Sequence, residues 1–191
     1  MQKELFRNDS YLKTCSSKII EILDEGLVLD NNVFYPEGGG QPGDVGNIKY
    51  DNKTFEIINT KYIDKKIVLC LESTAGFNLN QEMICEINWT RRFSIMQVHT
   101  CLHLLCSIIK APVTGGQISE GKGRLDFDLE SKPDKEFVIE NINKLIKGNF
   151  DVKVSSITEE ELDKNPELVR TMAVQPPRGS GSIRMISIGQ D

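Results

Sequence analysis

Histidine is scarce in this chain of 191 residues, which contains two. Long hydrophobic runs are also missing, because no stretch approaches the roughly 20 apolar residues that a membrane-spanning helix needs. The charged start, MQKELFRNDSYLK, lacks the apolar core of a signal peptide. The five cysteines are odd in number and form no C-x-x-C motif, which argues against a secreted disulfide scaffold. We therefore expect no membrane association, reduced thiols and a cytoplasmic location.

The chain also lacks an excess of positive charge. Its 23 Lys and Arg residues stand against 28 Asp and Glu, for a net charge of −5, which argues against a generic nucleic-acid binder. Residues 1–88 carry 9 basic and 14 acidic side chains, whereas residues 89–191 carry 14 of each. The acidity therefore belongs to the first part. A local basic groove in the second part stays compatible with the sequence, because phosphate contacts depend on nearby charge.

Short β-rich runs separated by Gly, Asn and Asp turns fill the first part of the chain. They predict strands at 14–23, 26–29, 45–50, 54–59, 66–71 and 83–89. Many brief strands of this kind are typical of a small barrel or a sandwich.

From Thr90 onward the hydrophobic period changes to that of a helix. The pattern predicts a helix over 90–110 with Thr90 as its N-cap. A second helix is expected from Pro133 to 147, with Gly148 as its stop. A short helix near 159–164 and strands at 125–129, 151–157, 171–174 and 183–188 complete the expected elements. The chain is therefore predicted to be α+β, with a boundary near residue 88.

The two histidines, His99 and His103, lie four residues apart on the first predicted helix. Side chains at i and i+4 share one helix face, so two imidazoles can chelate one Zn²⁺. The alternative is an ordinary packed or surface role, and the spacing favours the metal. A tetrahedral site needs at least three protein ligands. Cys106 does not serve, because seven residues of helix separate it from His99 by about 10 Å. The absence of His-Glu-x-x-His disfavours a metalloprotease.

Residues 34–46 read FYPEGGGQPGDVG and form a glycine-rich segment. Because glycine has no side chain, such a backbone can approach a ligand closely or bind an anion through its N–H donors. No Lys follows as it would in a P-loop. The alternative is a plain β-turn, so this segment alone is weak evidence for function.

Taken together, three segments resemble the AlaX family of free-standing alanyl-tRNA editing proteins and the editing domains of alanyl- and threonyl-tRNA synthetases. They are FYPEGGGQPGDVG (34–46), RRFSIMQVHTCLHLL (91–105) and TGGQISEGKGRLDFDL (114–129). The resemblance implies a glycine-rich-loop β-barrel domain (1–88). An α+β editing domain (89–191) would follow, with one long zinc-ligand helix packed on a mainly antiparallel sheet. The implied enzyme is a trans-editing hydrolase, an aminoacyl-tRNA deacylase that cleaves the ester of mischarged tRNA(Ala), chiefly Ser-tRNA(Ala).

The same resemblance assigns roles by matched position. His99 and His103 would be the first two zinc ligands. Residues expected to face the substrate pocket or the RNA end are Gly38, Gly39, Gly40, Gln41, Gly116 and Gln117. Zinc would activate a water, polarise the ester carbonyl or only orient the substrate, and no residue is assigned to the chemical step. The candidate phosphate contacts with the tRNA acceptor end, each otherwise a solvated surface charge, are Arg91, Arg92, Lys110, Lys122, Arg178 and Arg184.

The family's other zinc ligands lie in a C-x-x-x-H segment, downstream of a strand like residues 184–189. The sequence ends at Asp191, where that segment would begin. On this basis the zinc is expected to be absent or weakly held, since two ligands bind it less well than four. The alternative function is a tRNA-binding or dimerising module that is catalytically inactive. The sequence leaves the oligomeric state open.

Overall fold

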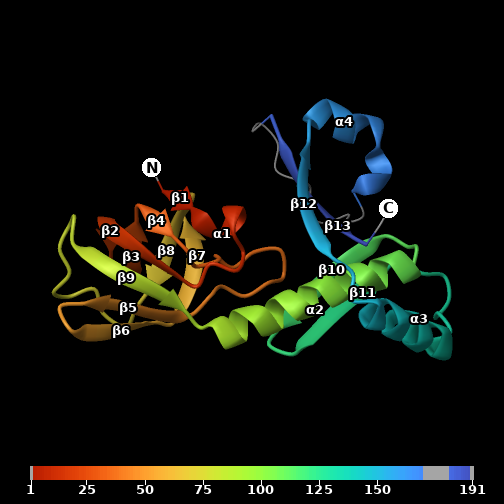
Figure 1. Cartoon of the computed structure of the whole chain (residues 1–191), viewed down its shortest axis with the longest axis horizontal. Coiled ribbons are helices and arrows are strands. Elements are labelled where there is room, and N and C mark those ends of the chain that lie inside the picture. Colours follow the sequence, from red (N-terminus) through yellow and green to blue (C-terminus); the bar gives the residue numbers. More distant parts are fainter. Residues whose placement is uncertain (1, 170–180, 190–191) are drawn as a thin grey trace. The chain divides into compact units, whose positions relative to one another are not determined.

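The computed structural model describes residues 2–169 and 181–189, and Figure 1 shows how the elements follow one another. The strand predicted at 171–174 and the candidate Arg178 lie outside the described residues. Within the described part, no helix is long and apolar enough to cross a membrane.

The chain divides into two compact units. The first comprises Met1–Gln97 and Ile118–Lys122, and the second Val98–Gln117 and Gly123–Asp191. The division falls inside the long helix α2 (Trp89–Ile108), whereas the sequence predicts a boundary just before it. The assignment of separate functional domains stays a prediction.

The first unit is built on one curled antiparallel sheet of seven strands, in the order β6-β5-β9-β2-β3-β8-β7 (Figure 1). In chain order these strands are β2 (Thr14–Leu23), β3 (Gly26–Leu29), β5 (Gly46–Tyr50), β6 (Lys53–Ile57), β7 (Asn59–Ile63), β8 (Lys66–Cys70) and β9 (Glu82–Ile87). Smaller elements add a parallel pair, β1 (Lys3–Glu4) with β4 (Asn31–Asn32), and the short helix α1 (Leu5–Asn8). Together with the helices described below, this sheet makes the chain α+β, as the sequence predicts.

Period-two alternation places the core on one face of this sheet. In β9 the side chains of Met83, Cys85 and Ile87 are buried, while those between them are more exposed. The predictions of β2 and β3 are confirmed to the residue. Strand β7 was missed: the strand predicted at 54–59 ends at the first residue of β7, and Ile58 alone separates β7 from β6.

Helix α2 begins one residue before its predicted N-cap. The Asn88 side chain accepts the backbone N–H of Arg91 at 3.1 Å, and the Asn88 carbonyl accepts that of Arg92 at 3.0 Å. Asn88 therefore caps the helix, and Thr90 lies inside its first turn.

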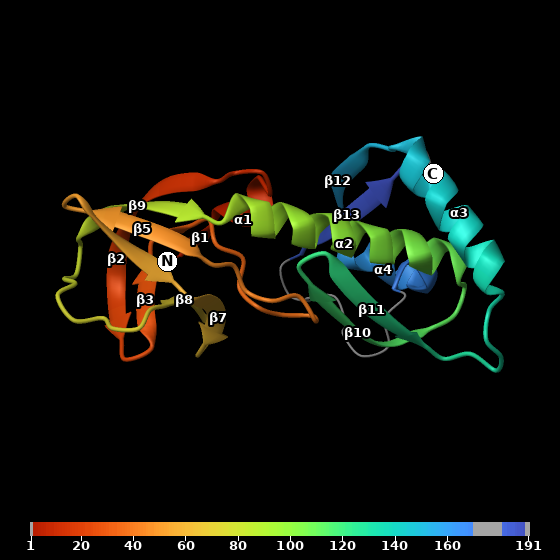
Figure 2. The same cartoon turned by 90° about the horizontal axis from the view of Figure 1, so that it is seen from below.

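The second unit contains two strand pairs and two further helices. Strands β10 (Val113–Ser119) and β11 (Lys122–Phe127) form a hairpin that lies beside α2 in Figures 1 and 2. Strands β12 (Val152–Ile157) and β13 (Ile183–Ile188) pair antiparallel. The remaining elements are α3 (Lys135–Gly148), α4 (Glu159–Lys164) and the 3-10 turn η1 (Pro166–Leu168).

The ends of α3 differ from their predicted positions. Asp134 is the N-cap, since its side chain accepts the N–H groups of Glu136 and Phe137, and Pro133 stands outside the helix. At the other end Asn149, at φ 44° and ψ 50°, takes the left-handed position expected of Gly148. Asn is the residue that tolerates this conformation best after glycine.

Candidate functional site

Two of the three family-like segments meet in a buried ion pair. Arg92, at the start of α2, pairs with Asp44 of the glycine-rich segment, and both side chains are 3% exposed. The Arg92 Nε donates to the two carboxylate oxygens of Asp44 at 2.9 and 2.7 Å, and its NH2 also donates to the Val33 carbonyl at 3.0 Å. This placement corrects the expectation for Arg92, because its guanidinium is not accessible to phosphate.

The three consecutive glycines form a tight turn on the surface of the first unit. Gly38 and Gln41 exchange two backbone hydrogen bonds, both 3.0 Å, and Gly39 and Gly40 between them have φ of 58° and 82°. These positive values are the reason for glycine here. The N–H groups of Gly38 and Gln41 therefore serve the turn rather than an anion. The Gln41 residue is 7% exposed, so its side chain lies inside the unit rather than facing RNA.

The turn is attached to the β10–β11 hairpin. The N–H of Ile118 donates to the Gly40 carbonyl at 2.8 Å, and residues 118–122 at the tip of the hairpin belong to the first unit. The structure thus brings the first and third family-like segments into contact at this point.

The histidines lie together on α2, in the part that belongs to the second unit. Their rings stack with centroids 4.9 Å apart and planes 15° from parallel. Desolvation lowers the pKa of both imidazoles, and for His99 the nearby His103 adds to this effect and brings its pKa to about 4. Both rings are therefore neutral near pH 7, which is the form that binds a metal ion.

The two imidazoles fit two positions of a zinc site. Within residues 2–169 and 181–189, no group of three or more His, Cys, Asp or Glu side chains gathers where it could hold a metal ion. The donor set that the described residues supply is thus the pair itself.

The hairpin beside α2 carries the other candidates of the second unit. A Cβ on Gly123 would lie 2.8 Å from Val98 and 3.0 Å from Leu102, so glycine lets β11 approach the helix closely. Gly116 and Gln117, expected to face the substrate pocket or the RNA end, lie in β10 and are exposed. The glycines at 115 and 116 gave this strand the pattern of a loop.

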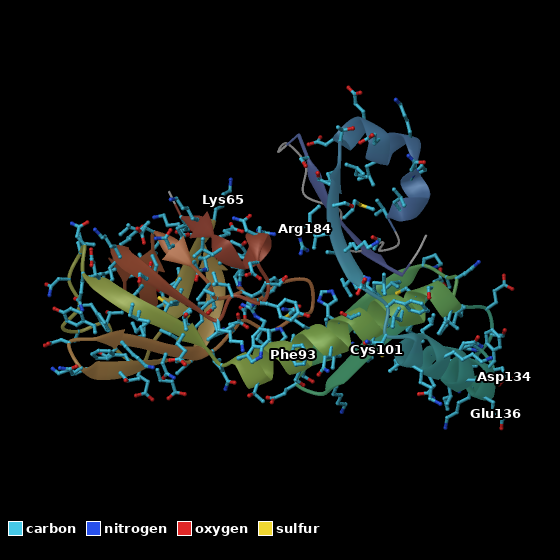
Figure 3. All side chains as sticks on the ribbon, viewed as in Figure 1. Lys65, Phe93, Cys101, Asp134, Glu136 and Arg184 are labelled. Carbon is cyan, nitrogen blue, oxygen red and sulfur yellow. The ribbon has the colours of Figure 1, made fainter. Side chains whose placement is uncertain are left out.

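The remaining basic candidates have different surroundings. Arg91 is half-buried and donates from NH1 to the Gly43 carbonyl at 2.8 Å. Lys110, Lys122 and Arg184 are exposed, and Figure 3 labels Arg184 on β13. These three stay open to phosphate as predicted candidates.

The sequence patterns predicted neither the role of Asp44 nor an aromatic cluster around Trp89. Asp44 lies within the glycine-rich segment, but no spacing rule links it to an arginine 48 residues away. The cluster joins Tyr11 to Trp89 and Phe93 of α2. The i and i+4 spacing puts the last two on one helix face, but no sequence pattern links them to Tyr11.

The family model described as tRNA synthetases class II (A) matches residues 7–91. The chain is 29% identical over 186 residues to the alanyl-tRNA editing protein AlaX-M of Saccharolobus solfataricus, covering 93% of this chain and 78% of that protein. It is 32% identical over 200 residues to the alanine–tRNA ligase of Pyrobaculum arsenaticum, covering 99% of this chain.

The alanine–tRNA ligases are much longer proteins. The chain spans 22% of the Pyrobaculum ligase and 16% of the Sulfurisphaera tokodaii ligase, to which it is 33% identical over 141 residues, 70% of this chain. Over residues 7–91 the chain is therefore similar to the class II (A) tRNA synthetases. The similarity to the alanyl-tRNA editing protein AlaX-M confirms the resemblance drawn from the sequence: the chain is AlaX-like.

Proposed function

We propose that this chain is an aminoacyl-tRNA deacylase that edits mischarged tRNA(Ala), chiefly Ser-tRNA(Ala), by hydrolysing its aminoacyl ester. The observation that carries the proposal is the similarity to an alanyl-tRNA editing protein over 93% of the chain. The alanine–tRNA ligases, related over 99% of this chain in one case, support the same substrate. A cytoplasmic location, where aminoacyl-tRNA is used, belongs to the proposal.

The proposal assigns a role to each unit. The curled sheet of the first unit would be the small β-barrel of the family and would present the exposed Gly38, Gly39 and Gly40 toward the acceptor end of the tRNA. Helix α2 would be the metal-binding helix, with His99 and His103 as ligands. Both imidazoles suit this role because they share one face and are neutral near pH 7.

The chemistry needed is modest, because an aminoacyl ester is already activated. Zinc, when bound, supplies Lewis acidity that polarises a carbonyl or lowers the pKa of a water. The chain itself would orient the substrate. A site that hydrogen-bonds a hydroxyl rejects substrates without one far more strongly than an apolar pocket rejects a methylene. Polar groups near the histidines would therefore favour serine over alanine.

The test compares two substrates under identical conditions. Ser-tRNA(Ala) and Ala-tRNA(Ala), each labelled in the amino acid, are incubated with the zinc-supplemented protein, and the released amino acid is followed over time. We expect rapid release of serine and slow release of alanine. Equal rates with and without protein for both substrates would refute the deacylase proposal.

A second candidate is a tRNA-binding or dimerising module without catalysis. The observation that favours it is that His99 and His103 are not joined by a third ligand among the described residues. It predicts that the protein binds tRNA(Ala) and releases neither amino acid. A filter-binding measurement on the same samples separates the two candidates, and sedimentation reports whether the bound protein is a dimer.

A further inference from the structure

An exposed aromatic cluster lies in the first unit, at the start of α2. Trp89 and Phe93 stack with centroids 5.4 Å apart, and Tyr11 lies 5.5 Å from Trp89 and 6.4 Å from Phe93. We call these three residues the aromatic cluster. Tyr11 is 61% exposed and Phe93 is 37% exposed, whereas Trp89 packs against the hydrophobic core. Figure 3 labels Phe93 near the beginning of the helix.

Hydrogen bonds to the backbone of residues 10–13 hold the segment that carries Tyr11 in place. The Tyr11 N–H donates to the Asp9 carboxylate at 2.8 Å, and the neighbouring carbonyl of Ser10 accepts from the buried Arg92 at 3.3 Å. The Lys13 carbonyl accepts the N–H of Ile87 at 3.0 Å. Trp89 and Phe93 follow at i and i+4 on a capped helix, so they share one face. The exposed rings therefore need little ordering before they meet a ligand.

One exposed cation, Lys13, and one exposed carboxylate, Asp9, lie beside the cluster. The Nζ of Lys13 lies 4.8 Å from the centre of the Trp89 ring, and Lys13 is exposed. The Asp9 carboxylate accepts the Tyr11 N–H, so it is fixed at the backbone of Tyr11, whereas the Lys13 side chain lies over the Trp89 ring. An aromatic surface next to a cation is the arrangement that binds single-stranded nucleic acid, because bases stack on the rings while the cation attracts the phosphate.

We propose that the aromatic cluster is a stacking platform for an unpaired base of the tRNA substrate, with Lys13 contacting the adjacent phosphate. The ligand follows from the proposed function, on which this inference rests. Paired bases present no free face to a protein ring, so the platform selects an unpaired nucleotide. Tyr11 and Phe93 offer the exposed ring surface, and Trp89 fixes them to the core.

Trp89 makes the proposal directly measurable, because it is the single tryptophan of the chain. Uncharged tRNA(Ala) is titrated into the protein while tryptophan emission and binding are followed together. We expect the emission to change in proportion to the bound fraction. Tyr11→Leu and Phe93→Leu should each weaken binding by roughly tenfold, the loss expected for one stacked base. Tyr11→Phe, which keeps the ring, should bind as the unchanged protein does.

Tyr50→Leu is the matched control, since Tyr50 is a 41% exposed aromatic side chain elsewhere in the first unit. Its affinity for tRNA(Ala) should stay within about twofold of the unchanged protein, as expected for a side chain that makes no contact. Lys13→Gln should lower the slope of log affinity against log salt by about one unit, as expected for one lost phosphate contact. Circular dichroism of each variant confirms that it is folded.

The outcomes separate this inference from the proposed function. Unchanged affinity in Tyr11→Leu and Phe93→Leu, together with constant Trp89 emission on saturation, would overturn the platform while serine release continued to support the deacylase. Failure of the unchanged protein to bind tRNA(Ala) would overturn both. A loss of affinity in Tyr50→Leu equal to that in Tyr11→Leu would also overturn the platform, because any exposed aromatic side chain would then behave alike.

Discussion

The two compact units bury their apolar side chains to very different extents. In the first unit Leu27, Phe34 and Ile48 are fully buried in one continuous core. In the described residues of the second unit, the buried hydrophobic side chains are Val113, Leu162 and Ile183, and α3 buries none. The first unit is therefore stabilised mainly by its hydrophobic core. Local features such as helix caps contribute a larger share of the stability of the second unit.

The ion pairs of the two units show the same contrast. Arg92 and Asp44 are 3% exposed and linked by several hydrogen bonds, whereas Arg124 and Asp126, 3.2 Å apart, are 67% and 47% exposed. Chemically similar pairs should therefore differ greatly in their contribution to stability, because water screens the exposed one.

The largest effect is expected from Arg92→Ala. The change leaves the Asp44 carboxylate buried without its partner, which costs about 3–5 kcal/mol in the free energy of unfolding. Denaturant unfolding followed by Trp89 emission measures it. Arg124→Ala is the matched control, followed by circular dichroism, and should change stability by less than about 1 kcal/mol. Equal losses in the two variants would remove the contrast between the units.

A smaller effect is expected from Gly43→Ala. A Cβ at this position would lie 2.0 Å from the Thr60 carbonyl oxygen, so the backbone must move. We expect a loss of about 1–3 kcal/mol, the range for overpacking a tight site, measured by the same denaturant curve. Gly38→Ala, whose added Cβ meets nothing within 4 Å, should stay within about 1 kcal/mol. Comparable losses at both positions would contradict this assignment.

The smallest effect concerns the cap of α3 in the second unit. Asp134→Ala removes the acceptor of the Glu136 and Phe137 N–H groups and should cost about 1 kcal/mol. The thermal midpoint of the helical signal measures this loss. Asp134→Asn keeps a capping oxygen and should preserve the midpoint. If both substitutions left the midpoint unchanged, local caps would not stabilise the second unit as proposed.

Local sequence patterns predicted much of the secondary structure. They did not predict contacts between residues that are far apart in the sequence. The predictions of β2, β3, α4 and β13 match the structure to the residue, because hydrophobic alternation and helix capping depend on residues that are close in the sequence. Strand β10 was missed because its glycines suggest a loop.

The candidate site was predictable to a similar degree. The spacing of His99 and His103 predicted that the two rings would share a face, and their side-by-side rings confirm it. Arg92 was misassigned to RNA, because its partner Asp44 lies far away in the sequence and burial cannot be inferred from charge alone. The aromatic cluster likewise joins Tyr11 to α2 through the fold.

The central proposal is that His99 and His103 of α2 would hold the zinc that supports ester hydrolysis on mischarged tRNA(Ala). Its most direct test is the single-turnover rate of serine release from Ser-tRNA(Ala) by the unchanged protein and by His103→Ala, with bound zinc measured in both. Our account predicts that the substitution removes the zinc and brings serine release down to the rate without protein. A His103→Ala protein that released serine as fast as the unchanged one would contradict it.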